Sequence, residues 1–320
     1  MNDAPPEEAP MDDATTRAET ILRATAGARL KTGSPMAPLT TFRIGGPAAL
    51  YLEPQGEEDL DAAARAVAQT GIRVVLIGKG SNLLVSDSGF DGLVLRLGRG
   101  YRWASRDGNR LSAGGAMPLP ALAGEALHHG LSGLEFGIAI PASVGGAVRM
   151  NAGAHEGSMA DVVERIEVFS LESGVSRSVS AEDAGFGYRR SGLQPDAVVV
   201  GVTVALAPAS PQEIRSRMEA ARVWRRETQP VAEPNCGSVF KNPPGDHAAR
   251  LIEAAGGRGM RVGGASVSTK HANFIVAEAG TRADDVLGLI RALQMLVEGS
   301  SGVRLETEVH LVGAFDRALD

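Results

Sequence analysis

The sequence predicts an α+β protein made of two folded units. Three patterns support this prediction: a β–α–β succession near the start, short alternating runs with turn residues between them in the middle, and two amphipathic helices with apolar strands toward the end. Short alternating runs separated by turns are typical of antiparallel strands. The chain is therefore expected to combine helices and strands of mixed direction.

Strands and helices alternate in the first half of the chain. Residues 40–54 predict a turn and a strand, residues 57–71 predict a helix closed by Gly71, and residues 72–87 predict a buried strand that runs into a glycine loop. Three short runs then predict antiparallel strands, at residues 92–97, 102–115 and 164–180. Residues 118–130 begin with proline and end with glycine, which predicts a helix between them.

A boundary between the two units is predicted near Pro208. The strand-like run 196–206 precedes "APASPQE", the most linker-like segment inside the chain. Beyond it, residues 211–228 and 281–299 carry apolar side chains at helical spacing, and these faces are expected to pack into a core. The strand-like runs "NFIVA" and "VRLETEVHLVG" complete an α+β unit at the end of the chain.

The start of the chain has a composition typical of disorder. The segment "MNDAPPEEAPMDD" holds five acids, no base and several prolines, so it cannot bury enough apolar surface to order itself. The expected organisation is a disordered acidic tail over residues 1–33, a first domain over 34–207 and a second domain over 208–320.

Charge and composition exclude several classes of function. The formal net charge of the 320 residues is −6, but without the five acids of the first segment the rest has 33 acidic residues against 32 basic ones. A nucleic-acid surface needs a net basic face, and a membrane span needs about 18 consecutive apolar residues. Neither is present, and the single cysteine, Cys236, favours a reducing cytoplasm. We expect a cytoplasmic monomer without nucleic-acid or membrane partners, and without a metal because the histidines lack ligand spacing.

Two glycine-rich loops are candidates for cofactor binding. Residues 78–82 of "LIGKGSNLL" follow a strand and could offer a nest of backbone N–H groups to a pyrophosphate, although neither a P-loop nor a G-x-G-x-x-G motif is present. In residues 136–157, proline and glycines interrupt an apolar run, and buried irregular backbone of this kind needs hydrogen-bond partners such as a flavin or nucleotide. A tight turn and a glycine-lined packing corner remain the alternative interpretations.

A third loop, within "NCGSVFKNPPGDHAARLIEAAG", holds a thiol, a hydroxyl, an amine and an amide just ahead of a predicted helix. Its glycines and prolines predict a turn, and Asp246 is expected to cap the helix. These breakers do not account for the polar side chains, which indicate a functional loop. Cys236 in this loop is either a nucleophile or a structural residue.

Eight motifs together resemble one enzyme family. In order along the chain they are "TTFRIGG", "GKGSNLL", "GLSGLEF", "IPASVGGAVRMNAGA", "FGYRRS", "CGSVFKNP", "GGASVSTKHANFIV" and "LETEVH". From about Thr40 onward the chain resembles the UDP-N-acetylenolpyruvoylglucosamine reductases, and the short segment after "FGYRRS" is similar to the type II branch of that family. The resemblance implies a two-lobed FAD-binding domain of the vanillyl-alcohol-oxidase type, followed by a substrate-binding α+β domain.

The resemblance also implies roles for individual residues. The implied FAD site comprises Arg43, Gly78, Lys79, Gly80, Ser81, Asn82, Leu83, Ile140, Pro141, Ser143, Gly145, Gly146, Asn151, Ala152 and Gly153. The implied substrate contacts are Tyr188, Lys241, Asn242, Arg258 and His271. The implied catalytic residues are Arg189, Ser238 and Glu308. Ala142 departs from a common glycine and would be strained if its φ were positive.

The chemistry implied by the resemblance is a pair of hydride transfers, from NADPH to non-covalently bound FAD and then to the enolpyruvyl group of UDP-N-acetylglucosamine enolpyruvate. Arg189 would clamp the substrate carboxylate with its planar fork, Glu308 would donate to that carboxylate or polarise it, and Ser238 would give a proton to the adjacent carbon. Strand alternation does not separate Glu308 from Glu306; only the motif favours Glu308.

Two other classes of function stay open on the sequence alone. One is another flavin oxidase or dehydrogenase of the same fold, which would need a base in place of Ser238 and Glu308. The other is a nucleotide-binding module without catalysis that keeps its glycine loops for stability.

Overall fold

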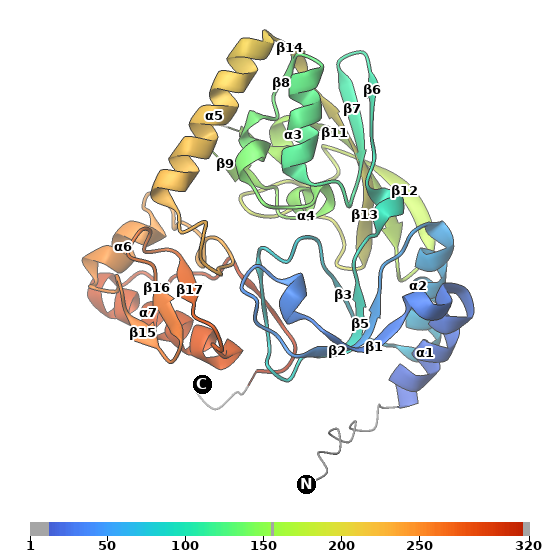
Figure 1. The fold of residues 1–320 in the computed structure, drawn as a ribbon, viewed down its shortest axis with the longest axis horizontal. Coiled ribbons are helices and arrows are strands. Elements are labelled where there is room, and N and C mark those ends of the chain that lie inside the picture. The colour runs from blue at the N-terminus through green and yellow to red at the C-terminus, as the bar shows by residue number, and fades with distance from the viewer. Residues whose placement is uncertain (1–12, 155–156, 316–320) are drawn as a thin grey trace.

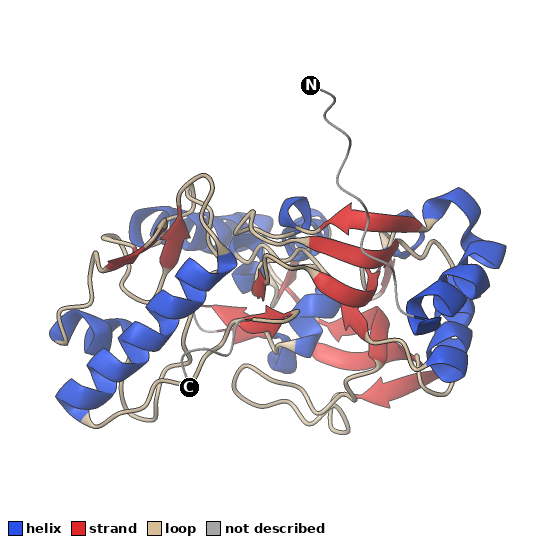
Figure 2. Ribbon diagram, turned by 90° about the horizontal axis from the view of Figure 1, so that it is seen from below, coloured by secondary structure: helices blue, strands red, loops and turns tan. Residues whose placement is uncertain are grey.

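The computed structural model describes residues 13–154 and 157–315, which form an N-terminal lobe, a middle lobe and a C-terminal domain (Figure 1). Strands lie mainly between helical regions at the two ends of the molecule (Figure 2). The helices are α1 (Asp13–Ala26), α2 (Glu57–Thr70), α3 (Leu119–His128), α4 (Val144–Arg149), α5 (Pro211–Thr228), α6 (Ala248–Ala254) and α7 (Ala283–Ser301).

The N-terminal lobe is built on a four-stranded sheet in the order β1-β2-β5-β3. Its strands are β1 (Lys31–Pro35), β2 (Pro47–Leu52), β3 (Val74–Leu76) and β5 (Phe90–Leu95), and the short β4 (Leu83–Val85) lies outside this sheet. Helix α2 is confirmed and ends at Gly71, whose φ of 67° is left-handed. The antiparallel direction expected for residues 92–97 is wrong, because β5 runs parallel to both β2 and β3. The crossover helix α2 makes this parallel arrangement possible.

The disordered tail expected over residues 1–33 is wrong for its second half, since α1 and the start of β1 fall inside it. Residues 1–12 lie outside the described part of the chain. Helix α1 packs against α2 (Figure 1), and its Ala18, Leu22 and Ala26 repeat every fourth residue and are buried in the lobe core. Arg29 forms an ion pair with the buried carboxylate of Asp59 on α2. The acidic composition of the first 13 residues therefore does not extend to the segment that follows.

Two truncated chains distinguish the contribution of residues 1–12 to stability from that of α1. Removing residues 1–12 is expected to leave the free energy of unfolding unchanged, whereas removing residues 1–29 is expected to lower it by about 3–5 kcal/mol, because Leu22 leaves a core and Asp59 stays buried without its cation. Urea unfolding of the two truncated chains and of the full chain measures the difference. Equal stability of all three chains would contradict the packing role of α1.

The middle lobe is an antiparallel five-stranded sheet in the order β12-β11-β13-β7-β6. The strands of this lobe are β6 (Ala104–Asp107), β7 (Arg110–Gly114), β8 (Leu131–Ser132), β9 (Gly153–Ala154), β10 (Gly157–Ser158), β11 (Val163–Ser170), β12 (Val175–Ser180), β13 (Ala197–Ala205) and β14 (Ala207–Pro208). The antiparallel pairs expected at residues 102–115 and 164–180 are confirmed as β6–β7 and β11–β12. Helices α3 and α4 contribute to the same core, so this lobe is a sheet covered by helices.

Helix α5 packs into the middle lobe, which bears on the predicted domain boundary. Ile214 and Met218 are buried in the core of the middle lobe, so α5 belongs to that lobe although it follows Pro208. In Figure 1 the helix runs from the middle lobe toward the C-terminal domain. The boundary predicted near Pro208 is therefore placed too early, and the division lies after Thr228, where α5 ends.

The C-terminal domain packs α6 and α7 against a small antiparallel sheet of β15 (Arg261–Val262), β16 (Ala265–Val267) and β17 (Ile275–Ala277). The strand expected over residues 303–313 is shorter, because only β18 (His310–Val312) is regular, and it pairs in parallel with β4 of the N-terminal lobe. The first N–H of α7, on Ala283, donates to the carboxylate of Asp87 at 2.9 Å. None of the described helices is long and apolar enough to cross a membrane.

Candidate active site

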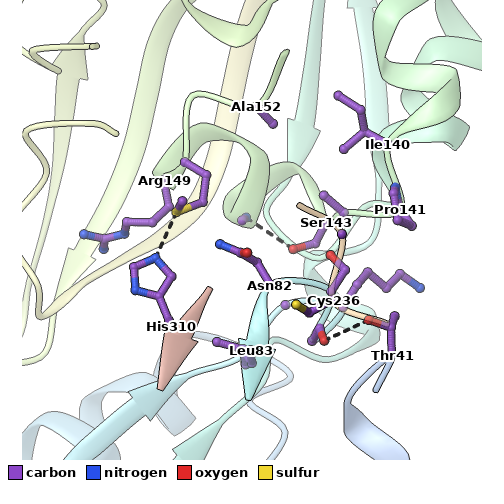
Figure 3. A pocket seen from close by; sticks show the side chains of 18 of the residues that line it. Thr41, Asn82, Leu83, Ile140, Pro141, Ser143, Arg149, Ala152, Cys236 and His310 are labelled. Carbon is purple, nitrogen blue, oxygen red and sulfur yellow. Dashed lines mark hydrogen bonds between the residues drawn. The ribbon is translucent and has the colours of Figure 1, made fainter. Parts of the chain in front are cut away.

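A cavity of about 1410 Å³ is lined by residues of both lobes and of the C-terminal domain. In Figure 3, Asn82, Ser143 and Cys236 lie around the same space, with Arg149 and His310 on one side and Ile140 and Pro141 on the other. Pockets for one drug-sized ligand measure roughly 300–1,000 Å³. This cavity is larger, so it has room for a cofactor and a substrate together.

The glycine loop 78–82 forms one wall of the cavity. Among the described residues, nothing accepts the backbone N–H groups of Lys79, Gly80 and Ser81. Gly80 has a φ of 64°, and a Cβ there would lie 2.0 Å from the carbonyl oxygen of Leu39, so no side chain fits. Successive free N–H groups in a tight turn form an anion-binding nest, which fits a pyrophosphate.

The cations at this wall reinforce its affinity for an anion. Burial, followed by the charges of Arg102 and Arg96, lowers the pKa of Lys79 below its usual value. All three residues line the cavity. A bound phosphate would relieve the repulsion between them, because it places negative charge beside three positive ones.

The second predicted loop forms the facing wall through Ile140, Pro141, Ser143 and Gly145 to Gly146. The hydroxyl of Ser143 caps α4 by accepting the N–H of Gly146 at 3.3 Å. Ala142 is not among the described non-glycine residues with positive φ, so alanine is unstrained there. Of the residues implied for the FAD site, only Asn151 does not line the cavity.

Asn151 instead holds two loops together at the edge of the site. Its Nδ2 donates to the carbonyl of Gly187 at 3.0 Å, and its Oδ1 accepts the N–H of Ala160 at 2.9 Å. The contact with Gly187 ties α4 to the loop that carries Arg189. Asn151 thus supports the site from behind the cavity wall.

Backbone strain is concentrated at this site. Three described non-glycine residues have positive φ: Arg43 at 60°, Asn151 at 41° and Arg189 at 56°. Each costs of order 1–3 kcal/mol and is kept only where the surroundings impose it. All three were implied as site residues by the motifs, which supports a functional reason for the strain.

The three residues implied as catalytic line the same cavity. Arg189 comes from the middle lobe, and Ser238 and Glu308 come from the C-terminal domain. Nε of Arg189 lies 3.2 Å from Oε1 of Glu308, and Nη1 of Arg189 donates to the carbonyl of Gly153 at 2.9 Å. The ion pair joins the middle lobe to the C-terminal domain across the cavity. It leaves part of the arginine guanidinium available to bind a ligand carboxylate.

The structure separates the two glutamates that the sequence could not. The Glu308 side chain is 14% exposed and lies in the cavity, whereas the Glu306 side chain is 71% exposed and pairs with Lys241. Burial raises the pKa of Glu308 above its ordinary value, although the charges of Arg189 and Lys241 oppose that rise. Glu308 is therefore the carboxyl group suited to carry a proton.

Cys236 lines the cavity but is a poor nucleophile. Its side chain is 2% exposed, and burial raises its pKa well above the usual range of a thiol, so the thiolate is disfavoured. Ser238, two residues later, is partly buried at the same wall. The loop thus presents a hydroxyl to the cavity.

The residues implied as substrate contacts divide into two groups. Asn242 and His271 line the cavity; Tyr188, Lys241 and Arg258 do not. Tyr188 lies at the rim, where its hydroxyl accepts the N–H of Asn242 at 3.4 Å. Arg258 is tied to Glu253 and to the carbonyl of Thr269, so its charge is used within the C-terminal domain.

The cap of helix α6 also differs from expectation. Asn242, not Asp246, accepts the first helical N–H, that of Ala248 at 3.1 Å. Asp246 accepts the preceding N–H of His247 and pairs with Arg250. The amide of Asn242 thus has a structural role beside the cavity.

Several cavity residues escaped the sequence reasoning, notably Trp224, Arg225, Arg149 and His310. Trp224 and Arg225 lie in the helix predicted over residues 211–228, whose pattern indicates only an apolar face that packs into a core. Nε2 of His310 lies 3.2 Å from Sδ of Met150. Within residues 13–154 and 157–315, no three histidine, cysteine or carboxylate side chains gather as metal ligands.

Comparisons with known proteins agree with this geometry. Residues 48–180 match the family model described as FAD binding domain, and residues 229–312 match that of the UDP-N-acetylenolpyruvoylglucosamine reductase C-terminal domain. The second match begins directly after α5, where the structure places the domain boundary.

Individual relatives cover nearly the whole chain. The chain is 45% identical over 281 residues to a UDP-N-acetylenolpyruvoylglucosamine reductase of Heliobacterium modesticaldum, covering 87% of this chain and 89% of that protein. It is 44% identical over 303 residues to one of an Anaeromyxobacter species, covering 95% and 94%. The crystal structure of the same reductase from Thermus caldophilus superposes with a TM-score of 0.77 at 38% identity, covering 88% of this chain and 98% of that one.

Proposed function

Since the chain belongs to the UDP-N-acetylenolpyruvoylglucosamine reductase family, we propose that it uses NADPH and non-covalently bound FAD to reduce the enolpyruvyl group of UDP-N-acetylglucosamine enolpyruvate. The product would be UDP-N-acetylmuramate, a precursor of peptidoglycan, and the enzyme would act as a cytoplasmic monomer. The observation that supports this best is the joining of Arg189 and Glu308 across the cavity that Ser238 also lines.

The residues present fit the cofactor. The free N–H groups of Lys79 to Ser81 would hold the pyrophosphate, and Ile140, Pro141 and Ser143 would line the ring. Bound FAD would supply the relay of hydride between the nicotinamide and the substrate. Arg43, Asn82 and Gly145 to Gly146 complete the proposed cofactor wall.

Residues of the chain would then stabilise the developing negative charge and donate a proton. Addition of hydride to an enol ether that bears a carboxylate pushes negative charge onto that carboxylate. The guanidinium of Arg189 and a protonated Glu308 would stabilise this charge, which is usually the largest contribution to catalysis. The Ser238 hydroxyl would give a proton to the adjacent carbon.

The test uses the purified protein, which should show flavin absorbance, and acid should release that flavin into solution. The same sample is assayed for oxidation of NADPH. We expect oxidation to depend on UDP-N-acetylglucosamine enolpyruvate, and UDP-N-acetylglucosamine, which lacks the enolpyruvyl group, to be inactive. A covalently attached flavin, or turnover of a hydroxy compound instead, would favour another flavin enzyme. A folded protein without flavin would contradict the proposed cofactor.

The protonation of Glu308 gives a pH prediction. Because burial raises its pKa in the folded protein, the protonated form is fully present at low pH and is lost as pH rises through that raised value. The rate of substrate reduction, measured by rapid mixing of substrate with the reduced enzyme, is expected to fall as pH rises through this value. Glu308→Gln should be slow at every pH and should not show this fall in rate. The same fall in Glu308→Gln would contradict the assignment.

A further inference from the structure

The side chain of Ser238 is not tethered by a hydrogen bond. Within residues 13–154 and 157–315, no backbone or side-chain group bonds to its hydroxyl. On its N-terminal side, the N–H of Gly237 donates to Oδ1 of Asn235 at 2.9 Å, which fixes a turn ahead of Ser238. The position of the hydroxyl in the cavity is therefore set by the backbone before and after this residue.

The backbone just after Ser238 is held by the buried side chain of Asn273. This asparagine is 4% exposed and lies in the connection between β16 and β17. Its Oδ1 accepts the N–H of Phe240 at 2.9 Å, and its Nδ2 donates to the carbonyl of Phe240 at 2.8 Å. Its backbone carbonyl accepts the N–H of Val239 at 2.9 Å. Three hydrogen bonds from one residue thus fix the two residues that follow Ser238.

The same segment is bonded to the residues around Glu308. The carbonyl of Val239 accepts the N–H of Glu308 at 2.8 Å. One residue later, Phe240 pairs with Thr307 in an antiparallel bridge. A shift of this segment would therefore change where the Ser238 hydroxyl lies relative to Glu308.

The pair of bonds to Phe240 requires an amide at position 273. An amide carries a donor and an acceptor side by side, which is what the N–H and the carbonyl of one residue need. A carboxylate would place a second acceptor against the carbonyl of Phe240, and an apolar side chain would leave both backbone groups without a partner. Since Phe240 is 1% exposed, water does not replace these bonds, and the segment would move to find others.

We propose that Asn273 is a positioning residue for the proton donor and holds the Ser238 hydroxyl toward the reacting carbon by fixing the backbone of residues 239 and 240. The inference rests on the proposed function, in which Ser238 protonates that carbon. Asn273 lines the cavity, but the oxygen and the nitrogen of its amide both bond to Phe240. Asn273 therefore acts through Ser238, and its loss should lower kcat while KM and flavin reduction by NADPH stay unchanged.

Asn273→Asp tests this role in the FAD-loaded enzyme, because it keeps the size and the acceptor of the side chain and removes the donor. Substrate reduction, measured by rapid mixing of the sugar with the reduced enzyme, should slow about a hundredfold, the effect of a small misplacement of a reacting group. Asn273→Ser, which buries no charge, is the second variant if the aspartate prevents folding, and the same result is expected. An unchanged rate of substrate reduction in the folded variant would overturn the proposal.

The matched control is Gln294→Leu, which removes another side-chain amide of the C-terminal domain, one that donates to the carbonyl of Leu305 at 2.9 Å. Both half-reactions of this control should keep the rates of the unmodified enzyme. Combination with Ser238→Ala separates positioning from general damage: once the hydroxyl is gone, Asn273→Asp should slow substrate reduction little further, because residues that act as a unit are not additive. The same loss with and without Ser238, or a raised KM with unchanged kcat, would overturn the proposal.

Amide hydrogen exchange, followed by mass spectrometry, measures the hold on this segment without turnover. The peptide that contains Val239 and Phe240 should exchange faster in Asn273→Asp than in the unmodified enzyme and in Gln294→Leu, and equal exchange in all three would overturn the proposal. If the unmodified enzyme reduces the sugar and Asn273→Asp does so at the same rate, the proposed function stands and only the positioning role fails. If the unmodified enzyme does not reduce the sugar, the proposed function fails, and the positioning role fails with it.

Discussion

Ser238→Ala is expected to slow reduction of the enolpyruvyl substrate by about a thousandfold or more, while NADPH reduces the flavin almost as fast as in the unmodified enzyme. Loss of an essential proton donor costs about 4 kcal/mol of barrier, which corresponds to that factor. The two half-reactions are measured separately by rapid-mixing absorbance at the flavin band. The selectivity arises because the hydroxyl serves only the step that protonates carbon.

Cys236→Ala is the matched control for this loop, because Cys236 lines the same cavity two residues earlier and its thiol stays protonated. Both half-reactions of Cys236→Ala should proceed at rates close to those of the unmodified enzyme. Equal loss in both half-reactions of Ser238→Ala would show that the change disturbs the loop and would remove the proton-donor role.

Arg189→Gln is expected to lower kcat/KM for the sugar substrate by about 10²–10³, the range seen when one donor to a developing charge is removed. The planar fork of arginine meets a carboxylate through two hydrogen bonds, so Arg189→Lys should restore little of the activity. The measurement is steady-state kinetics with the sugar substrate, accompanied by flavin reduction by NADPH, which should persist.

Arg190→Gln is the control for that variant, because Arg190 is the next residue and its side chain is exposed. It removes the same charge from the same loop outside the cavity. Comparable losses in Arg189→Gln and Arg190→Gln would mean that overall charge, and not the clamp, explains the effect.

Local patterns along the chain predicted much of the fold. Helix α2 with its glycine stop, the β6–β7 hairpin and the β11–β12 pair follow from local periodicity and turn residues. The direction of β5 was wrong because strand direction depends on partners far away in sequence. The domain boundary was placed too early because a linker-like composition says nothing about the core against which the next helix packs.

The site shows the same division between local and distant information. Motif register brought Arg189, Ser238 and Glu308 together correctly in one cavity, but alternation alone left Glu306 and Glu308 equivalent. Their difference is burial, which comes from the C-terminal domain meeting both lobes. Trp224 and Arg225 were missed because a helix face turned toward a cavity has the same pattern as one turned toward solvent.

The parallel pairing of β18 with β4 has a consequence for biogenesis. Strand β4 directly follows the glycine loop, and its partner lies at residues 310–312, so the loop gains this support only after those residues have been synthesised. A nascent chain would therefore complete this wall of the cavity only once residues 310–312 have left the ribosome, and fragments lacking them would expose an unprotected strand edge to aggregation.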